Sequence, residues 1–233
     1  MPTVIPQTQR PLVQNYLLRH LPDVEQRHLQ QSAELVKLEF GERLCQIDED
    51  YQHLYFPLTA FVSLIAKLPG HPPLEMGLIG FEGVLGATVV LHTRRVPSEA
   101  IVQGAGMAWR IPVGDVEDAL SHCNSFLLML QTYLFNLQGQ ISANAVCAHF
   151  HQVEARLARW LLMSHDRIQN DELFLTHQFL AEMLGVRRSS VTVAAGFLQT
   201  NGIILYNRGR LHILDRQSLL ARSCSCYQPL LTN

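Results

Sequence analysis

The sequence predicts an α+β protein with an antiparallel β-roll, then one long helix, then a small helical unit that ends in a hairpin. Three observations support this prediction. Residues 34–111 contain short β-prone runs separated by glycine and proline. Residues 115–150 contain no proline and follow a helical period. Residues 175–214 combine two short helical patterns, a turn glycine and two β-prone runs. The predicted domains are residues 12–114, 115–150 and 151–222.

Composition is that of a globular protein with an uneven charge distribution. The chain has 233 residues, of which 48% are hydrophobic and 16% charged, so it can bury a sizeable core. Residues 1–152 carry 9 Lys and Arg against 14 Asp and Glu, whereas residues 153–233 carry 9 Arg against 6 Asp and Glu. The basic excess therefore lies in the C-terminal part. No apolar run is long enough to span a membrane, and the N-terminus lacks the core of a signal peptide, so no membrane partner is predicted. The five cysteines lack the spacing of a disulfide framework, which predicts a cytoplasmic protein.

Two short helices are expected before the roll, Asn15–Leu21 and Asp23–Leu29, separated by Pro22. Residues 1–10 are polar and are expected to be frayed. Short strands at near-regular spacing are typical of a small antiparallel barrel or roll. The expected strands are Leu35–Phe40, Leu54–Phe56, Phe61–Leu68, Leu74–Ile79, Ala100–Val102 and Met107–Ile111.

The long helical segment carries an apolar seam with alternating spacings of three and four. Its members are Leu127, Leu130, Leu134, Leu137, Ile141, Asn144 and Ala148. Such a seam is typical of a helix that pairs with a second copy of itself, and a polar Asn144 within it would fix the register. The alternative is a helix that packs along its own barrel. Both arrangements are compatible with the pattern.

A further helix, Val153–Arg167, leads into two short helices joined by a tight turn. Thr176 is a candidate N-cap for the first of them, and Gly185 ends it because the turn needs a residue that tolerates positive φ. The second helix is predicted from Arg187 to Thr200. Its expected buried face is Val191, Ala195 and Leu198. These features predict a helix-turn-helix.

Two β-prone runs, Ile203–Tyr206 and Arg210–Leu214, follow directly and flank a turn at residues 207–209. A helix-turn-helix followed by a hairpin is a winged helix, which places its second helix in the major groove of DNA. The alternative is a helical hairpin whose arginines are merely solvated. The candidate DNA-binding residues are Thr176, Gln178, Arg187, Arg188, Ser189, Ser190, Thr192, Arg208 and Arg210.

In this order of parts the chain resembles the cyclic-AMP receptor protein / fumarate–nitrate regulator (Crp/Fnr) family of bacterial transcription factors. The resemblance covers most of residues 12–222 and is most specific at His53–Ala66, Gly77–Gly86, Arg156–Leu162 and the winged helix. It implies a jelly-roll sensor like a cyclic-nucleotide-binding domain, a dimerisation helix and a reader of a palindromic operator. The implied partners are double-stranded DNA, a second copy of the chain and RNA polymerase.

The nucleotide site of that family is degenerate here. Relatives that bind cyclic nucleotides carry Gly-Glu-Leu, whose carboxylate accepts from the ribose, and a later arginine that pairs with the phosphate. Here the first motif is Gly83-Val84-Leu85, and the second falls near Arg95 and Val96. The candidate ligand pocket is Gly83, Val84, Leu85 and Arg95. Without the ribose-binding carboxylate and the phosphate-binding arginine, the chain is predicted not to respond to cyclic AMP. Arg95 is expected to be an exposed charge in a loop.

Neither a cofactor nor a metal is predicted. No cysteine cluster of the kind that holds an iron–sulfur centre in relatives precedes Cys45. Cys224 and Cys226 form too short a motif to define a metal site, so they are expected to be free thiols. His149 and His151 flank the hinge after the long helix without a paired ligand spacing.

No enzyme motif is present, and the protein is predicted not to be an enzyme. The alternative to a DNA-binding regulator is an allosteric module that binds a small nucleotide-like ligand and uses its helix-turn-helix for protein contacts.

Within the second helix, relatives that respond to nucleotides carry Arg-Glu and a second arginine four residues after that glutamate. This chain keeps the first arginine as Arg188, but Ser189 and Val193 replace the other two residues. The operator is therefore expected to differ from the relatives' sequence at the bases that those two residues read.

Overall fold

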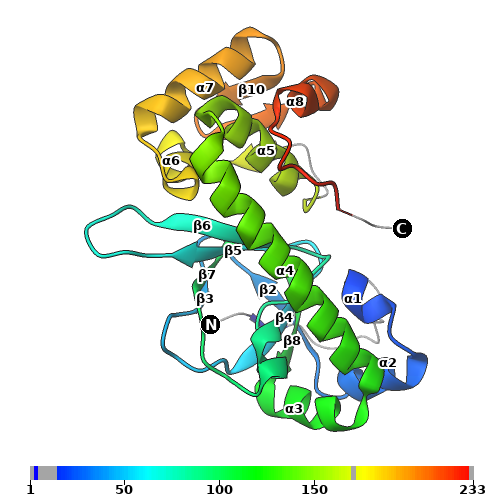
Figure 1. The fold of residues 1–233 in the computed structure, drawn as a ribbon. Coiled ribbons are helices and arrows are strands. Elements are labelled where there is room, and N and C mark those ends of the chain that lie inside the picture. The colour runs from blue at the N-terminus through cyan, green and yellow to red at the C-terminus, as the bar shows by residue number, and fades with distance from the viewer. Residues whose placement is uncertain (1–2, 5–14, 169–171, 231–233) are drawn as a thin grey trace. The chain divides into compact units, whose positions relative to one another are not determined.

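The computed structural model describes residues 3–4, 15–168 and 172–230 (Figure 1). The elements group into two compact units. The N-terminal unit contains the residues up to Leu64 together with Leu78–Gly139, and the C-terminal unit contains Ile65–Gly77 together with Gln140–Leu231. This division falls within the long helix and the roll, and it differs from the three segments proposed from the sequence.

Two four-stranded sheets form the β-roll. The first has the order β1-β2-β8-β4 and the second the order β3-β7-β5-β6. The strands of the first sheet are β1 (Thr3–Val4), β2 (Glu34–Leu38), β8 (Gly106–Pro112) and β4 (His53–Pro57). The strands of the second sheet are β3 (Arg43–Cys45), β7 (Glu99–Gly104), β5 (Phe61–Ala66) and β6 (Leu74–Ile79). Neighbours in the first sheet run antiparallel, as does the β3–β7 pair, which confirms the predicted α+β class with antiparallel sheets.

The six predicted strands are all present, and the additional elements are short. Strand β3 has three residues, and a 3-10 helix η2 spans Ala87–Leu91. Thr3–Val4 pair with Val36 and Lys37, so the expectation of a frayed start is wrong for those two residues. The other residues expected to be frayed, and residues 12–14 of the predicted roll, lie outside the described residues.

Both sheets contribute to one core in the N-terminal unit. Val36 and Phe56 of the first sheet and Val62 and Val102 of the second are fully buried in the same apolar cluster, together with Phe126 of the long helix. The alternation of apolar residues that predicted the strands therefore points into this shared interior.

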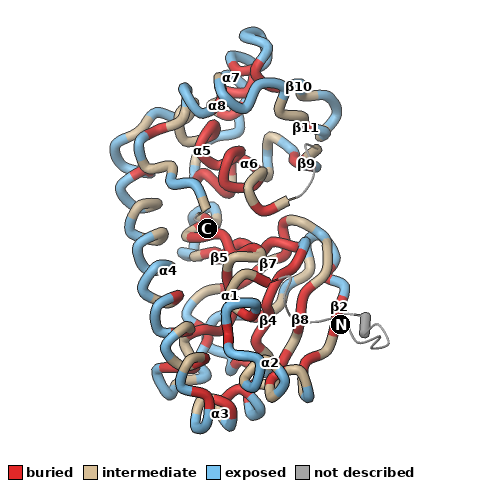
Figure 2. Tube along the Cα trace, turned by 90° about the vertical axis from the view of Figure 1, so that its right-hand side faces the viewer, coloured by how far each residue is buried: buried red, intermediate tan, exposed pale blue. Residues whose placement is uncertain are grey.

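Helices α1 (Tyr16–Arg19) and α2 (Asp23–Gln30) match the two predicted short helices. The single long helix predicted from residue 115 is instead two helices, α3 (Val113–His122) and α4 (Asn124–Phe150). The chain leaves helical geometry at Cys123, which has φ −112° and ψ 88°. The carboxylate of Glu25 in α2 accepts from the backbone N–H groups of Ser125 and Phe126 and so stabilises the new helix start. The residues along α4 range from buried to exposed (Figure 2).

The C-terminal unit contains the winged helix. Its elements are α5 (Val153–His165), β9 (Glu172–Phe174), α6 (His177–Leu184), α7 (Arg188–Thr200), β10 (Ile204–Asn207), β11 (Arg210–Ile213) and α8 (Arg216–Arg222). The hairpin pairs with β9 in the order β10-β11-β9, so the wing has a third strand that the sequence did not indicate. None of the helices among the described residues is long and apolar enough to cross a membrane.

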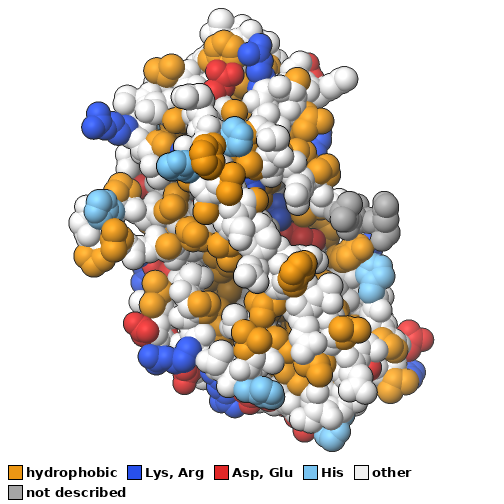
Figure 3. All heavy atoms as spheres, in the orientation of Figure 1, with side chains coloured by type: hydrophobic (Ala, Val, Ile, Leu, Met, Phe, Trp, Pro, Cys, Tyr) orange, Lys and Arg blue, Asp and Glu red, His pale blue; other side chains and the backbone are white. Residues whose placement is uncertain are grey.

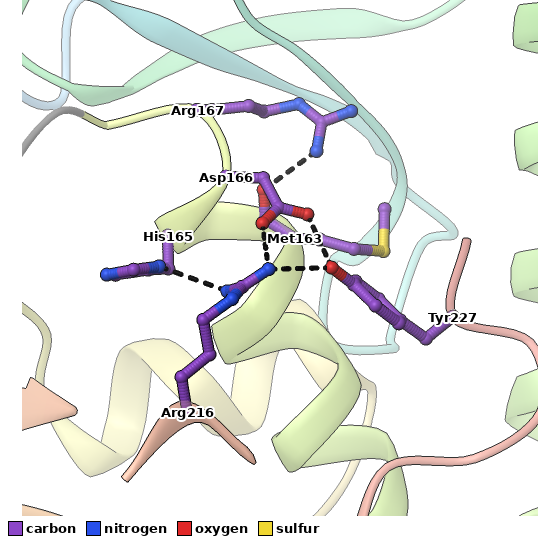
Figure 4. Close-up of polar contacts among 6 residues, drawn as sticks. All are labelled: Met163, His165, Asp166, Arg167, Arg216 and Tyr227. Atoms are coloured by element: carbon purple, nitrogen blue, oxygen red, sulfur yellow. Dashed lines mark hydrogen bonds and ion pairs between the residues drawn. The ribbon is translucent and has the colours of Figure 1, made fainter. Parts of the chain in front are cut away.

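A polar network holds the last described segment against α5 (Figure 4). The Arg216 guanidinium donates to Asp166 at 2.6 Å and to the Tyr227 hydroxyl at 2.9 Å. The Tyr227 hydroxyl donates to the second Asp166 oxygen at 2.8 Å. The residues after α8 are therefore anchored to the end of α5.

Candidate nucleic-acid interface

The first helix of the motif is bounded by local interactions that the sequence predicts. The Thr176 hydroxyl accepts from the Phe179 N–H at 3.0 Å and caps the start of α6. Gly185 ends the helix at φ 62°, and the Val186 N–H returns to the Ala181 carbonyl at 2.9 Å. This is a Schellman turn, which favours glycine because an L side chain is strained at positive φ.

The second helix, α7, has one buried and one exposed face. Val191, Ala195 and Leu198 are at most 2% exposed, as predicted for the face packed on the motif's core. On the other face Val193 is 74% exposed, although it is apolar. Such a side chain is available to contact an apolar group on a partner.

The N-terminal end of α7 presents a cationic and polar surface. Arg187, Arg188 and Ser189 are exposed, and Ser190 is half-buried. The helix itself contains no acidic residue, and its N-terminus adds the positive end of the helix dipole. This end of α7 therefore favours an anionic partner.

The remaining predicted residues of the first two helices have structural partners. Gln178 donates to Glu182 at 2.8 Å, one turn further along α6. The Thr192 hydroxyl lies 3.1 Å from the Arg188 carbonyl, to which it donates, and 3.0 Å from Nδ1 of His177. The bond between Thr192 and His177 joins the exposed faces of α6 and α7.

His177 is a member of this surface that the sequence analysis did not identify. Its ring stacks on Tyr206 of the wing, with centroids 4.7 Å apart and planes 9° from parallel. Burial lowers the pKa of His177, and the charge of Arg188 lowers it further. Its Nε2 is buried without a hydrogen-bond partner among the described residues, which disfavours a second proton there. The ring is therefore neutral at neutral pH and joins α6 to the wing.

The two wing arginines differ in their surroundings. Arg208 and Gly209 form a two-residue turn with φ of 48° and 83°, which places Arg208 exposed at the tip. Arg210 lies 3.7 Å from the Glu172 carboxylate and over the Phe174 ring, with its guanidinium carbon 5.3 Å from the ring centroid. Part of the charge of Arg210 is thus balanced within the wing.

The predicted seam of α4 faces mainly inward. Leu130 is fully buried, and Leu127, Leu134 and Leu137 pack against the core of the N-terminal unit. This is the arrangement in which the helix lies along its own roll.

The later seam residues belong to the C-terminal unit. Ile141 is half-buried and Ala148 is exposed. Asn144 does not face an open surface, because it donates to the Met76 carbonyl at 2.7 Å and accepts from Arg159 at 2.6 Å.

The exposed face of α4 is displaced by about one residue from the predicted seam. Its large apolar members are Leu128, Phe135, Val146 and Phe150, which are 49–75% exposed. Apolar side chains also gather over α4 in the space-filling view (Figure 3). The sequence pattern located the inward stripe of the helix and missed this one, because polar and small residues interrupt it.

The residues of the candidate ligand pocket lie in two different environments. Val84 and Leu85 are at most 1% exposed and belong to the core. A Cβ added at Gly83 would clash with the side chain of Tyr133, so the ring packs directly against that backbone. Arg95 is exposed and donates to the Asp48 carbonyl at 2.6 Å. Val84 and Leu85 therefore belong to the core, whereas Arg95 lies at the surface.

Cys224 and Cys226 are free thiols, but they are not isolated. Their sulfur atoms group with that of Cys147 and with a ring nitrogen of His151, all within 4.8 Å of one another. The sequence held one signal of this cluster, the four-residue spacing of Cys147 and His151.

Comparison with known proteins agrees with this geometry. Residues 155–222 match the family model of the Crp-like helix-turn-helix domain. No curated protein matches the sequence. Among solved structures, FixK2 from Bradyrhizobium japonicum is 16% identical, with a TM-score of 0.70 over 83% of this chain and 98% of that one.

The solved structures of two proteins from Thermus thermophilus are also similar to this chain. TTHB099, a transcriptional regulator of the CRP family, is 16% identical with a TM-score of 0.69 over 83% of this chain and 98% of that one. TTHA1359, a transcriptional regulator of the CRP/FNR family, is 19% identical with a TM-score of 0.62 over 82% and 98%. At these identities the likeness establishes the fold.

Fold and site together define a protein with an N-terminal β-roll and a C-terminal winged helix of the helix-turn-helix class. More particularly, residues 155–222 are a Crp-like helix-turn-helix domain, and the chain has the fold of the Crp/Fnr family. The resemblance that the sequence predicted is confirmed.

Proposed function

We propose that the protein is a sequence-specific transcriptional regulator that binds a palindromic operator as a homodimer. The observation that carries this proposal is the exposed start of α7, where Arg187, Arg188 and Ser189 lie at the positive end of a helix without acidic residues. A helix of this kind fits the major groove, where its first residues reach base edges.

Three exposed residues of α7 have distinct expected roles. The Arg188 guanidinium can donate two hydrogen bonds to the O6 and N7 atoms of a guanine. Ser189 can donate or accept and so discriminates weakly between bases. Val193, at 74% exposed, suits the methyl group of a thymine.

The wing contributes binding that does not depend on sequence. Arg208 at the tip can contact a phosphate, which adds affinity to every DNA alike. Arg210 is already paired with Glu172, so we expect it to attract a DNA phosphate less strongly than Arg208 does. Its ion pair instead helps to hold the strands of the wing together.

Dimerisation is proposed through the exposed stripe of α4. Leu128, Phe135 and Val146 lie on the face opposite the buried leucines, and Gly139 lies between them with no atom within 4 Å of its would-be Cβ. A second copy of α4 could bury these apolar groups, and the small residue would allow close approach. For such a two-fold dimer we expect a palindromic operator whose half-site centres are one helical turn apart.

The roll supports regulation that is independent of cyclic AMP, because Val84 and its neighbours are packed inside the core. RNA polymerase is the further partner expected of such a regulator, and the cytoplasm is its expected location.

Selection of bound DNA from a random pool by the full-length protein tests the function directly. We expect a palindromic sequence with guanine at one position of each half-site. Arg188→Ala should cost about 1–3 kcal/mol and relax the preference at that base, because one bidentate contact is lost.

The matched control is Arg208→Ala at the wing tip. It should weaken binding to all sequences and reduce the salt dependence without changing the preferred bases. If the pool yields no enriched sequence and binding shows no salt dependence, the helix-turn-helix serves protein contacts instead.

A further inference from the structure

Four side chains with metal-binding atoms converge within the C-terminal unit. Cys147 lies in the last turn of α4, and His151 follows the end of that helix. Cys224 and Cys226 follow the end of α8. Their three sulfur atoms and one ring nitrogen all lie within 4.8 Å of one another, although the two segments are more than seventy residues apart.

The separations match the edges of a small tetrahedron. The Sγ atoms of Cys147 and Cys224 are 3.4 Å apart, and Sγ of Cys226 is 3.7 Å from Nδ1 of His151. A zinc ion with Zn–S bonds of about 2.3 Å in tetrahedral geometry holds neighbouring sulfurs roughly 3.8 Å apart. The ligand atoms would therefore need only small shifts to surround one ion.

Local backbone structure fixes both halves of the set. The His151 N–H donates to the Cys147 carbonyl at 3.2 Å, which continues the helical geometry and places the two side chains on one face. The Tyr227 N–H donates to the Cys224 carbonyl at 3.0 Å and closes a turn around Cys226. Tyr227 itself is anchored to Asp166 and Arg216, so the turn is held in place.

The charge around the cluster suits thiolate ligands. The guanidinium of Arg159, a residue only 7% exposed, donates to the Cys226 carbonyl at 3.1 Å. Three thiolates, one imidazole and a divalent ion leave one net negative charge, which this guanidinium can offset.

An ion has a route to this position. Cys147 and Arg159 line a cavity of about 380 Å³ within the same unit, together with Asn144 and Arg156. The half-buried Cys226 and His151 give a second approach from solvent.

We propose that Cys147, His151, Cys224 and Cys226 bind one zinc ion. Three sulfurs and one nitrogen are a ligand set that structural zinc sites use, and four protein ligands leave no open position for catalysis. An iron–sulfur cluster holds its ligands on several irons and therefore further apart than these atoms lie. A disulfide between Cys147 and Cys224 would use only half of the set. The ion would link the segment after α8 to the end of α4 and so stabilise the C-terminal unit.

Metal analysis of the full-length protein tests the proposal. Protein purified under reducing conditions and exposed to Zn²⁺ should retain about one zinc per chain after gel filtration. Cys226→Ser and His151→Ala should each weaken zinc binding by more than the roughly 10–100-fold that loss of a supporting residue costs, because a ligand itself is removed. Cys45→Ser and Cys123→Ser, at cysteines outside the cluster, are the matched controls and should retain the ion.

A measurement on the unmodified protein covers the case in which a variant fails to fold. Co²⁺ added to the metal-free protein should produce intense visible bands and sulfur-to-metal charge transfer, saturating at one ion per chain. A weak octahedral spectrum, retention of no zinc, or loss of two free thiols as a Cys147–Cys224 disulfide would each overturn the proposal. A chelator should also lower the melting temperature of the zinc-loaded protein, because the ion binds only the folded chain.

Discussion

Asn15 connects α1 to the roll through both ends of its side-chain amide. Its Oδ1 accepts from the Leu17 and Leu18 N–H groups and caps the helix. Its Nδ2 donates to the carbonyls of Pro57 at 2.9 Å and Gly83 at 3.0 Å. The side chain is fully buried, so no water can replace these bonds.

Asn15→Ala should therefore be strongly destabilising. Two buried carbonyls lose their donor, and α1 loses its cap, which together should reduce the free energy of unfolding by more than about 2 kcal/mol. Denaturant unfolding of the full-length protein measures this loss. Asn136→Ala, the same substitution at an exposed position of α4, is the control, and an equal loss in both variants would contradict the assigned role.

His177 should make the winged helix sensitive to acid. Because its folded pKa lies below the ordinary value of 6.5, the unfolded chain binds more protons than the folded chain in this range. Its contribution to stability is therefore present above about pH 6.5 and is lost as the pH falls towards the folded pKa. His177→Gln should flatten the fall in melting temperature between about pH 7 and pH 5.

The comparison must be made as a difference between the two proteins, because His53 in the roll also has a lowered pKa and titrates in both. Identical pH profiles for the wild type and His177→Gln would show that His177 does not control this transition.

Among single residues, those fixed by local geometry were predictable and those fixed by distant partners were not. Thr176 and Gly185 bound one helix, so their roles follow from their immediate neighbours in the sequence. The proposed zinc-ligand set depends on two segments that meet only in the folded chain, and the cap of α4 comes from Glu25 about a hundred residues away. No local pattern contains either partnership.

At the scale of elements, α4 shows that a helical period predicts a helix and its apolar stripe, but not what that stripe packs against. The three-four spacing of leucines correctly predicted a long helix with one apolar stripe. That stripe packs on the chain's own core, and the exposed stripe is a second one, beginning at Leu128. The break at Cys123 was also hidden, because no glycine or proline marks it.

The exposed stripe predicts the effect of charge on assembly. Phe135→Glu should yield monomers, because Phe135 is 75% exposed in the single chain and a buried interface would have to desolvate the new carboxylate. Monomers should stay folded, at a melting temperature below that of the dimer because the stabilisation from association is lost, and should bind operator more weakly. Analytical ultracentrifugation and operator titration measure the two effects.

Two further variants separate this surface from the inward stripe. Gln138→Glu, at an exposed position on the flank of α4, should stay dimeric. Leu130→Glu should unfold the subunit, because Leu130 is fully buried in the core. A Phe135→Glu protein that sediments as a dimer would refute the proposed interface.

At the scale of the whole molecule, the order of roll, helix and winged helix was predictable because the hydrophobic period changes from two to near four and back along the chain. The division into two compact units was not. Residues Ile65–Gly77 belong to the roll's strands by sequence order but group with the C-terminal unit. Their contacts explain this grouping, since Glu75 accepts from the buried Trp160 indole at 2.9 Å and Met76 accepts from Asn144. Such pairings between distant segments have no signature in local periodicity.

The packed interior of the roll leads to a prediction for the full-length protein. Cyclic AMP should neither raise its melting temperature nor change its affinity for operator. A nucleotide in the roll would have to displace the side chains of Val84 and Val96, which are at most 3% exposed, and it would find Arg95 engaged by Asp48 at the surface. A ligand present at 100 times its Kd stabilises a protein by about 2.7 kcal/mol, so a micromolar site would be evident in a thermal melt at about 100 μM cyclic AMP. 5′-AMP is the control for unspecific effects. A saturable shift with cyclic AMP alone would mean that the core of the roll opens to admit it, and the assignment of a closed, nucleotide-independent sensor would fail.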